Sequence, residues 1–324
     1  MSVIGTSDLS GNLHTYYFKM LLDTAKKNLK FWGLGKQKIH PKGNGKDSFM
    51  LKFGHVASST NELTEGVTPT AASIATNKYT VTVKQYGQYI SLSDFLTFTA
   101  IDPILEDVSS ELGYTAALST DTIIRDNLVA NATTSTQYVG SGNTADNDIA
   151  ATETFTAQDA LKGVRVLRGQ DAPAFDDGLF VWLVHPYISI DIMSDTSAGG
   201  FIDLNKYVAG LADGPLNGEV GKVYGARVVE STNVNYAANN GSVNVYRTFM
   251  FAKDSFAVTS FDKDHIELIV KQLGSGGTAD PLNQIATAGY KLQFGVKYVG
   301  GDFTNANSSS PDLAIQIRGA ATGG

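Results

Sequence analysis

The chain has 324 residues, of which 42% are hydrophobic and 18% are charged, so it can form a sizeable core and is not wholly disordered. Its 25 basic and 32 acidic residues give a formal net charge of −7. This balance argues against a dedicated nucleic-acid binder, which carries a basic surface. The absence of cysteine excludes disulfides, thiolate metal sites and cysteine catalysis.

The N-terminal residues lack the basic and apolar regions of a secretory signal. The longest apolar run covers residues 179–184, whereas a membrane span needs about 20 residues. We therefore expect a soluble protein that is made in a cytoplasm and has no membrane partner.

The first predicted element is an amphipathic helix over residues 13–32, where apolar side chains recur at steps near 3.6. Its apolar positions are Leu13, Tyr17, Leu21, Ala25, Leu29 and Trp32. Lysines gather in the last turns, which the helix dipole favours, and Gly33 and Gly35 are expected to end the helix.

Residues 36–92 predict an extended β-hairpin. A short strand is expected over residues 47–53 and a long one over residues 78–92, where apolar and polar residues alternate. The connection between them is polar and rich in Ser, Thr and Ala. Because an isolated hairpin is only marginally stable in water, we infer that it lies on something else.

A long helix is predicted over residues 102–131, with Asp102 as its N-cap and Pro103 at its first position. A helix of this length measures about 45 Å, so we expect it to span the molecule. Asp121 and Arg125 have the i,i+4 spacing of an ion pair.

The rest of the chain predicts a mixed α and β body. Residues 132–155 are low in complexity and are expected to form a surface loop or domain boundary. A helix over residues 156–168 opens with a variant capping box from Thr156 to Asp159. The further elements expected are a buried strand at 179–185, a helix from Pro186, a loop at 199–218, and strands at 220–223, 226–230, 244–252, 265–271, 290–299 and 314–318. Because regular βαβ alternation is missing, the fold class predicted is α+β.

Few residues suggest chemistry, and each has a simpler structural explanation. Asp262, Asp264 and His265 could ligate a metal, but a turn before a strand explains them better. Asp191 and Asp195 could act as paired carboxylates, yet on a helix they more often face water. His185 is best explained as the end of a buried strand. Residues 43–46 resemble part of a phosphate loop but lack its earlier glycine and following helix. We predict no catalytic, cofactor or metal site and no enzyme.

Three stretches carry a resemblance through their order and spacing. The first is Glu65-Gly-Val-Thr-Pro69 followed by residues 78–94 and a long helix. The second is Val184-His-Pro-Tyr187 entering a helix, and the third is the glycine-punctuated run at 218–231. Together they resemble the major capsid proteins of tailed phages, in particular the group typified by the coliphage N-four capsid protein. The resemblance covers roughly residues 10–300.

This resemblance implies the Hong Kong 97-type shell fold and a division of the chain into five parts. By analogy, these are an N-terminal arm (1–35), an extension loop (36–92), a peripheral domain (93–155) containing the spine helix (102–131), a mainly axial domain (156–255), and return strands with the C-terminal tail (256–324). The implied function is self-assembly through pentamers and hexamers into an icosahedral shell around double-stranded DNA. The implied location is the virion, assembled in the host cytoplasm.

The partners implied are copies of the same chain, with a separate scaffold protein, a portal and a decoration protein as further candidates. DNA would be enclosed without sequence-specific binding. The residues that we expect at contacts between copies are Glu62, Glu65, Lys84, Tyr86 and Trp32. Lys52 and Asn283 are of the types that crosslink in some relatives, but nothing in the sequence singles them out.

Three alternatives stay open at this point. The first is an encapsulin-like compartment or another phage particle protein, which a cargo enzyme encoded nearby would favour. The second is an α/β enzyme or ligand-binding protein, which would need a pocket with convergent polar groups. The third is an outer-membrane or surface protein, against which the missing signal and the long helix argue.

Overall fold

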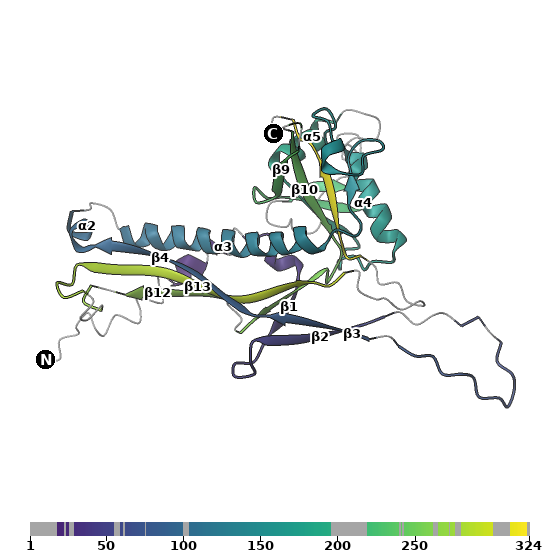
Figure 1. Cartoon of the computed structure of the whole chain (residues 1–324), viewed down its shortest axis with the longest axis horizontal. Coiled ribbons are helices and arrows are strands. Elements are labelled where there is room, and N and C mark those ends of the chain that lie inside the picture. The colour runs from purple at the N-terminus through teal and green to yellow at the C-terminus, as the bar shows by residue number, and fades with distance from the viewer. Residues whose placement is uncertain are drawn as a thin grey trace.

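The computed structural model describes residues 18–22, 24–25, 29–54, 59–60, 62–74, 76–99, 104–195, 219–239, 241, 243–261, 265–271, 273–275, 280–300 and 312–322. These residues form a long body, in which a helix lies along a twisted sheet, and a rounded body at one end of it (Figure 1). A two-stranded hairpin and its connecting segment project from the long body beneath the rounded one. The molecule is therefore extended. One hydrophobic core continues from the long body onto one face of the rounded body's sheet, and a second core lies on the other face of that sheet.

The sheet of the long body is built around one central strand. Its members are β1 (Lys36–Ile39), β4 (Lys84–Ser93), β11 (Phe256–Ser260), β12 (Ile266–Lys271) and β13 (Ile285–Tyr298). The 14-residue strand β13 pairs antiparallel with β4, β11 and β12, whereas β1 adds to β11 in parallel. A strand this long gives the body its length, since each residue adds about 3.3 Å.

One face of this sheet is covered by α3 (Ile104–Asn131), which follows the short helix α2 (Asp94–Thr99). The buried side of α3 presents Leu112, Ala116, Ile124 and Leu128 to a core that β13 completes with residues such as Phe294. Burying each large side chain contributes about 1.5–3 kcal/mol. The amphipathic pattern of the sequence therefore fixes which side of α3 faces the sheet.

The projecting hairpin pairs β2 (Asp47–Phe53) with β3 (Thr76–Thr82). The sequence predicted one strand over residues 78–92, but the structure divides it at Val83. The N–H of Val83 donates to the carbonyl of Lys46 at 2.8 Å, which closes the hairpin. The chain then joins β13 as β4, so the first half of the predicted strand belongs to the hairpin and the second half to the long body.

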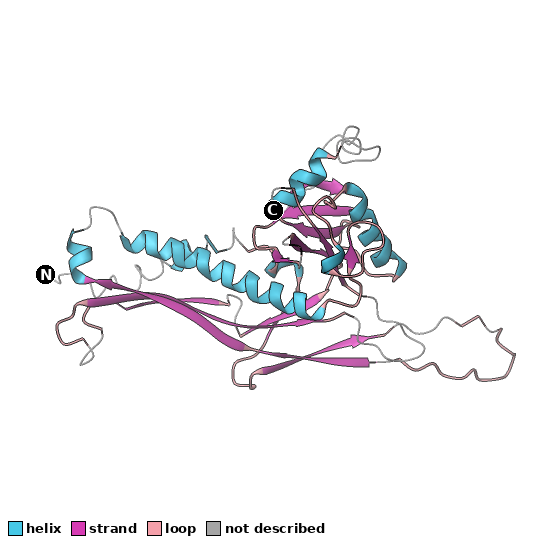
Figure 2. Ribbon diagram, turned by 45° about the horizontal axis from the view of Figure 1, so that its top comes forward, coloured by secondary structure: helices cyan, strands magenta, loops and turns pink. Residues whose placement is uncertain are grey.

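The rounded body contains a seven-stranded mixed sheet (Figure 2). Its strands are β5 (Gln137–Tyr138), β6 (Phe180–Val184), β7 (Glu219–Val223), β8 (Ala226–Glu230), β9 (Asn235–Ala238), β10 (Asn244–Phe251) and β14 (Ala314–Gly319). It also includes α4 (Ala157–Gly169), α5 (Pro186–Ser194) and the short 3-10 helix η2 (Asp146–Asp148). Every residue of β6 is buried, as its continuous apolar run predicted.

Several local expectations differ from the structure. In the predicted helix at 13–32, the described residues 18–22 and 24–25 are helical, but 29–31 are not, and a separate 3-10 helix η1 (Trp32–Leu34) follows. Residues 137–155, expected to form a loop or boundary, instead include β5 and η2 and lie with the rounded body. Asp102, Pro103 and the predicted loop at 199–218 lie outside the described residues.

Candidate assembly surfaces

The hairpin carries large apolar side chains on a face that its own chain leaves open. Phe49, Leu51 and Phe53 alternate along β2 and are exposed by 49%, 62% and 64%. On the opposite face, Tyr79 and Val81 of β3 are buried. Exposed apolar groups arranged in a row mark a surface that contacts another molecule.

The segment that connects β2 and β3 is exposed at every described residue between 62 and 74. It contains the predicted contact residues Glu62 and Glu65, and the N–H of Val67 donates to the carbonyl of Thr64 at 3.2 Å to close a turn there. Leu63 and Val67 expose 77% and 63% of their surface. The segment thus offers charged and apolar groups together at the far end of the hairpin (Figure 1).

The other predicted contact residues lie on the long body rather than on the hairpin. Lys84 is exposed at the start of β4, opposite Phe294. Tyr86 is half-buried with its ring 5.7 Å from that of Phe294, and burial raises the pKa of its hydroxyl. Trp32 stacks on His265 at 3.6 Å between ring centroids and meets Phe294 edge-on. The structure therefore does not bring the five candidates into one site.

A short segment before η1 joins the two bodies to α3. The ring of Phe31 is buried and contacts Phe249 and Phe251 of β10 edge-on at 6.5 and 6.1 Å. The carboxylate of Asp121 accepts the backbone N–H groups of Lys30 at 2.7 Å and Phe31 at 3.3 Å. Three consecutive residues thus have partners in three places: Lys30 in α3, Phe31 in the sheet of the rounded body, and Trp32 in the long body.

The predicted ion pair between Asp121 and Arg125 is wrong. Arg125 instead donates to Asp126 at 2.7 Å and to the side chain of Asn233 at 2.6 Å. Asp121 is buried, and burial raises its pKa to about 7, although the N–H donors of Lys30 and Phe31 act in the opposite direction. Spacing on the helix predicted the pair, but the backbone N–H groups of the N-terminal segment bind the carboxylate of Asp121, and Arg125 has other partners.

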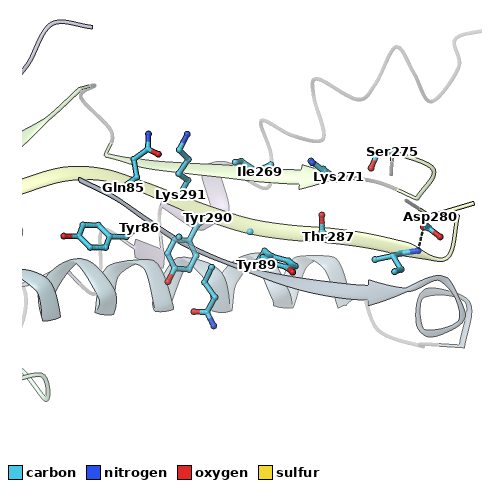
Figure 3. Close-up of a pocket in the computed structure, with 14 residues that line it drawn as sticks. Gln85, Tyr86, Tyr89, Ile269, Lys271, Ser275, Asp280, Thr287, Tyr290 and Lys291 are labelled. Atoms are coloured by element: carbon cyan, nitrogen blue, oxygen red, sulfur yellow. Dashed lines mark hydrogen bonds between the residues drawn. The ribbon is translucent and has the colours of Figure 1, made fainter. Parts of the chain in front are cut away.

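An open groove lies on the face of the long sheet away from α3, with a volume of about 740 Å³ (Figure 3). Tyr89, Ile269 and Ile285 supply its apolar walls, and Lys271 and Lys291 supply charge. The carboxylate of Asp280 accepts the backbone N–H of Ile285 at 2.8 Å and fixes the loop at its end. Among the described residues, the polar groups that line the groove are spread along it (Figure 3), whereas a small-molecule site has a few polar groups that converge.

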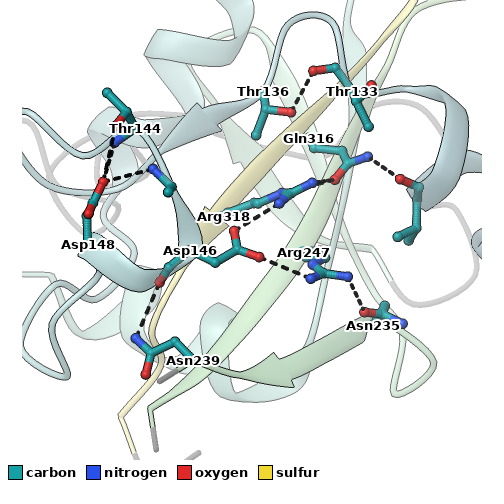
Figure 4. Close-up of polar contacts among 12 residues, drawn as sticks. Thr133, Thr136, Thr144, Asp146, Asp148, Asn235, Asn239, Arg247, Gln316 and Arg318 are labelled. Atoms are coloured by element: carbon teal, nitrogen blue, oxygen red, sulfur yellow. Dashed lines mark hydrogen bonds and ion pairs between the residues drawn. The ribbon is translucent and has the colours of Figure 1, made fainter. Parts of the chain in front are cut away.

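A polar cluster anchors the segment 137–155 to the rounded body (Figure 4). The carboxylate of Asp146 accepts hydrogen bonds from Arg247 at 3.0 Å and Arg318 at 2.9 Å. Partial burial acts to raise the pKa of Asp146, but the two guanidinium groups outweigh it and hold this pKa below its usual range. The carboxylate of Asp148 accepts the N–H groups of Thr144 and Ala145. Asp146 and Asp148 therefore both stabilise the structure of this segment.

His185 and Asp191, two of the residues that suggested chemistry in the sequence, have structural partners. The ring of His185 caps α5 by accepting the N–H of Tyr187 at 3.2 Å, and burial lowers the pKa of His185. The carboxylate of Asp191 accepts the N–H of Thr322 at 2.9 Å and so binds the residues that follow β14. Asp262 and Asp264 lie outside the described residues, and no group of metal-ligating side chains occurs within the described part of the chain. Among these same residues, no helix is both long and apolar enough to cross a bilayer.

Comparison with known proteins decides between the alternatives. Residues 77–303 match the sequence model of a family described as phage capsid protein. The chain belongs to this family. No curated protein matches this capsid protein by sequence. The predicted phage major capsid protein with an α+β, Hong Kong 97-type fold is thereby confirmed, and the chain is a structural component of a phage shell.

Solved structures share the fold at low sequence identity. The capsid of Ralstonia phage GP4 has a TM-score of 0.72 at 13% identity, with 89% of this chain and 87% of that chain covered. The Cyanophage Pam1 capsid has a TM-score of 0.61 at 18% identity, with 87% of both chains covered. The head of Helicobacter pylori bacteriophage KHP40 has a TM-score of 0.63 at 10% identity, with 90% of this chain and 92% of that chain covered.

Proposed function

We propose that this capsid protein assembles through pentamers and hexamers into the icosahedral shell that encloses a tailed phage's double-stranded DNA. The observation that carries the proposal is the hairpin, which has apolar residues on both faces but is covered by its own chain on one face only. Covering the second face of each hairpin with another copy removes this apolar surface from water.

The two bodies suit different roles in such a shell. We assign the rounded body to the centre of each capsomer, the long body to its periphery, and the hairpin with residues 62–74 to a neighbouring copy. The chain before residue 36 would serve as the arm. The position of the rounded body at one end of the long body (Figure 1) supports this assignment, because copies that repeat around an axis can then meet through the rounded bodies at the axis and through the long bodies around it.

The five proposed contact residues differ in how much of each side chain is exposed to a neighbouring copy. Glu62, Glu65 and Lys84 are exposed, so they are the side chains offered to a neighbour. Tyr86 and Trp32 already contact Phe294, so they would contribute only their remaining exposed edges. A separate scaffold, a portal and a decoration protein are further proposed partners, with assembly in the host cytoplasm.

Expression of the full chain alone, followed by size exclusion and negative-stain microscopy, tests the proposal. Shells, pentamers or hexamers are expected. If the chain is a monomer, the experiment is repeated with the scaffold protein of the same phage. A chain that stays monomeric in both experiments would contradict the proposed function.

A further inference from the structure

The C-terminal end of α3 is completed by a side chain from another part of the chain. The amide nitrogen of Gln316, a fully buried residue of β14, donates to the carbonyl of Val129 at 3.1 Å and to that of Ala132 at 2.9 Å. The last carbonyls of a helix have no partner within the helix, and the last turn of α3 contains no basic residue that could serve. A strand of the rounded body therefore completes the end of a helix of the long body.

The oxygen of the same amide is held by an arginine. It accepts hydrogen bonds from Nε and Nη2 of Arg318 at 3.1 and 2.8 Å. Gln316 and Arg318 are two positions apart on β14, so their side chains lie on the same face of the sheet. Because a guanidinium group can only donate, Arg318 orients the amide of Gln316 with its oxygen towards the arginine and its nitrogen towards α3.

The position of Arg318 depends in turn on a carboxylate. In the register of β10 and β14, Arg318 lies directly opposite Arg247, and like charges at directly opposite positions repel each other. The carboxylate of Asp146 accepts from Arg318 at 2.9 Å and from Arg247 at 3.0 Å, so it bridges the two guanidinium groups. Figure 4 shows the row of contacts from Gln316 through Arg318 and Asp146 to Arg247.

We propose that Gln316, Arg318 and Asp146 act as a relay through which the segment 137–155 positions the C-terminal end of α3. This segment follows α3 in the chain and lies on β14 through the pairing of β5. The relay closes a loop, since the backbone leads from α3 to Asp146 and the three side chains lead from Asp146 back to α3. The end of α3 and the segment 137–155 are therefore expected to loosen together.

The relay crosses the junction between the two bodies. The helix α3 lies along the sheet of the long body, whereas β14 and η2 belong to the rounded body (Figures 1 and 2). By holding the end of α3 on β14, the relay keeps the rounded body at a fixed angle to the long body. This consequence deepens the proposed function and rests on it, because copies form one closed shell only when the rotation from copy to copy is constant.

Two acidic residues of η2 separate the relay from local stabilisation. Asp148 accepts the N–H groups of Thr144 and Ala145 within its own segment, whereas Asp146 binds side chains of β10 and β14. If the contacts of η2 stabilised only their surroundings, removing either carboxylate would loosen the segment 137–155 alone. The relay predicts that only the loss of Asp146 reaches α3.

Hydrogen exchange of the full, unassembled chain, followed by mass spectrometry of its peptides, tests the relay. The variants are Asp146→Asn, Gln316→Glu and the two combined, with Asp148→Asn as the matched control. Gln316→Glu keeps an acceptor for Arg318 but removes the donor to the carbonyls of α3. If Gln316→Glu lacks the wild-type dichroism spectrum, Gln316→Met replaces it in both variants, since methionine has a similar volume and no donor.

Asp146→Asn is expected to speed exchange in the segment 137–155 and in residues 129–133, at the end of α3, by about tenfold. Asp148→Asn should speed exchange in residues 144–149 and leave the end of α3 as in the wild type. Gln316→Glu should speed exchange at the end of α3, and adding Asp146→Asn should speed it there no further. Negative-stain microscopy of assembled particles should show a wider spread of diameters for Asp146→Asn than for the wild type.

Three results would overturn the relay. The first is an Asp146→Asn variant in which residues 137–155 loosen while the end of α3 stays unchanged. The second is an Asp148→Asn variant that loosens the end of α3 as much as Asp146→Asn does. The third is a double variant whose exchange at the end of α3 rises by the product of the two single effects, since Asp146 and Gln316 would then act independently.

Failure of the relay and failure of the proposed function are distinguishable. The exchange measurements use the unassembled chain, so they decide the relay whether or not the wild type forms shells. Asp146→Asn shells with the same narrow spread of diameters as wild-type shells would contradict the fixed angle between the two bodies. A wild type that stays monomeric with its scaffold would contradict the proposed function.

Discussion

The carboxylate of Asp121 on α3 accepts the backbone N–H of Lys30 at 2.7 Å, across 91 residues of sequence. It also accepts the N–H of Phe31, whose ring is buried against β10. One acidic side chain therefore holds the segment that connects the N-terminal residues to both bodies.

Replacing Asp121 with alanine should destabilise the unassembled chain by about 2–4 kcal/mol, because two buried N–H groups lose their acceptor. Urea unfolding followed by circular dichroism measures the change. Glu111→Ala, at an exposed position of the same helix, is the control and should change stability by less than about 0.5 kcal/mol. Equal effects of the two substitutions would show that the Asp121 contact does not hold the segment.

Two buried titratable side chains, Asp121 and His265, should shape the dependence of stability on pH. Burial raises the pKa of Asp121 to about 7, so its contribution is complete below its unfolded pKa and is lost as pH rises through 7. Burial lowers the pKa of His265 to about 3, so its contribution is complete above its unfolded pKa and is lost as pH falls towards 3. Between about pH 4 and 6.5 the two effects oppose each other.

Asp121→Asn removes only the first of these effects. From pH 5 to 8, the stability of the wild type should therefore fall relative to that of the variant, by at most about 3 kcal/mol. Urea unfolding of both proteins across this range makes the comparison. Parallel curves would contradict a raised pKa for Asp121.

Alanine substitutions at Phe31 and Phe49 should have different effects on the stability of the chain and on its assembly. Phe31→Ala empties a buried position and should cost about 3–5 kcal/mol of unfolding free energy. Phe49→Ala, at a residue exposed by 49%, should leave unfolding of the unassembled chain nearly unchanged but weaken assembly. Calorimetry and sedimentation velocity measure the two quantities. A loss of stability without a loss of assembly for Phe49→Ala would reverse the assigned roles.

Asp146→Ala should loosen the segment 137–155, because the guanidinium groups of Arg247 and Arg318 lose their shared partner. We expect a cost of about 1–3 kcal/mol and faster hydrogen exchange in this segment. Since the pKa of Asp146 is lowered, its contribution in the wild type is present above the unfolded pKa and is lost in acid. Asp176→Ala, whose side chain is 91% exposed, should leave exchange there unchanged.

Gly113 allows the N-terminal helical residues to approach α3. A Cβ at this position would lie 2.6 Å from the carbonyl oxygen of Leu21. Gly113→Ala should therefore displace residues 18–25 and increase their cleavage by a protease. Gly169→Ala meets no atom within 4 Å and serves as the control. Unchanged cleavage in both variants would mean that the close approach does not hold these residues in place.

Periodicity in the sequence was enough to predict α3, α4 and the hairpin, because one buried face dominates each pattern. A continuous apolar run was enough to predict β6, which is buried on both faces. It could not predict the partner of Asp121, since that partner is backbone from a segment 90 residues away. The position of Asp121 beside the buried Thr120 and Ile124 was the available signal. An acidic residue on the apolar side of a helix requires a buried donor.

Other features of the structure could not be predicted from the local sequence pattern. The break at Val83 depends on where two sheets diverge, and nothing in the alternation of residues 78–92 marks it. The strands β5 and β9 are two and four residues long, which is too short for a periodic signal. Exposed contact residues such as Glu62 and Glu65 could be selected only through the resemblance, because an acidic residue on a hairpin has the same local pattern with or without a partner.

A cryo-electron microscopy map of the particles formed by the full chain, with its scaffold where needed, tests the central claim most directly. The account predicts closed icosahedral shells in which rounded bodies surround the capsomer axes and each hairpin lies on a neighbouring copy. Open aggregates, or shells in which every hairpin contacts only its own chain, would contradict it.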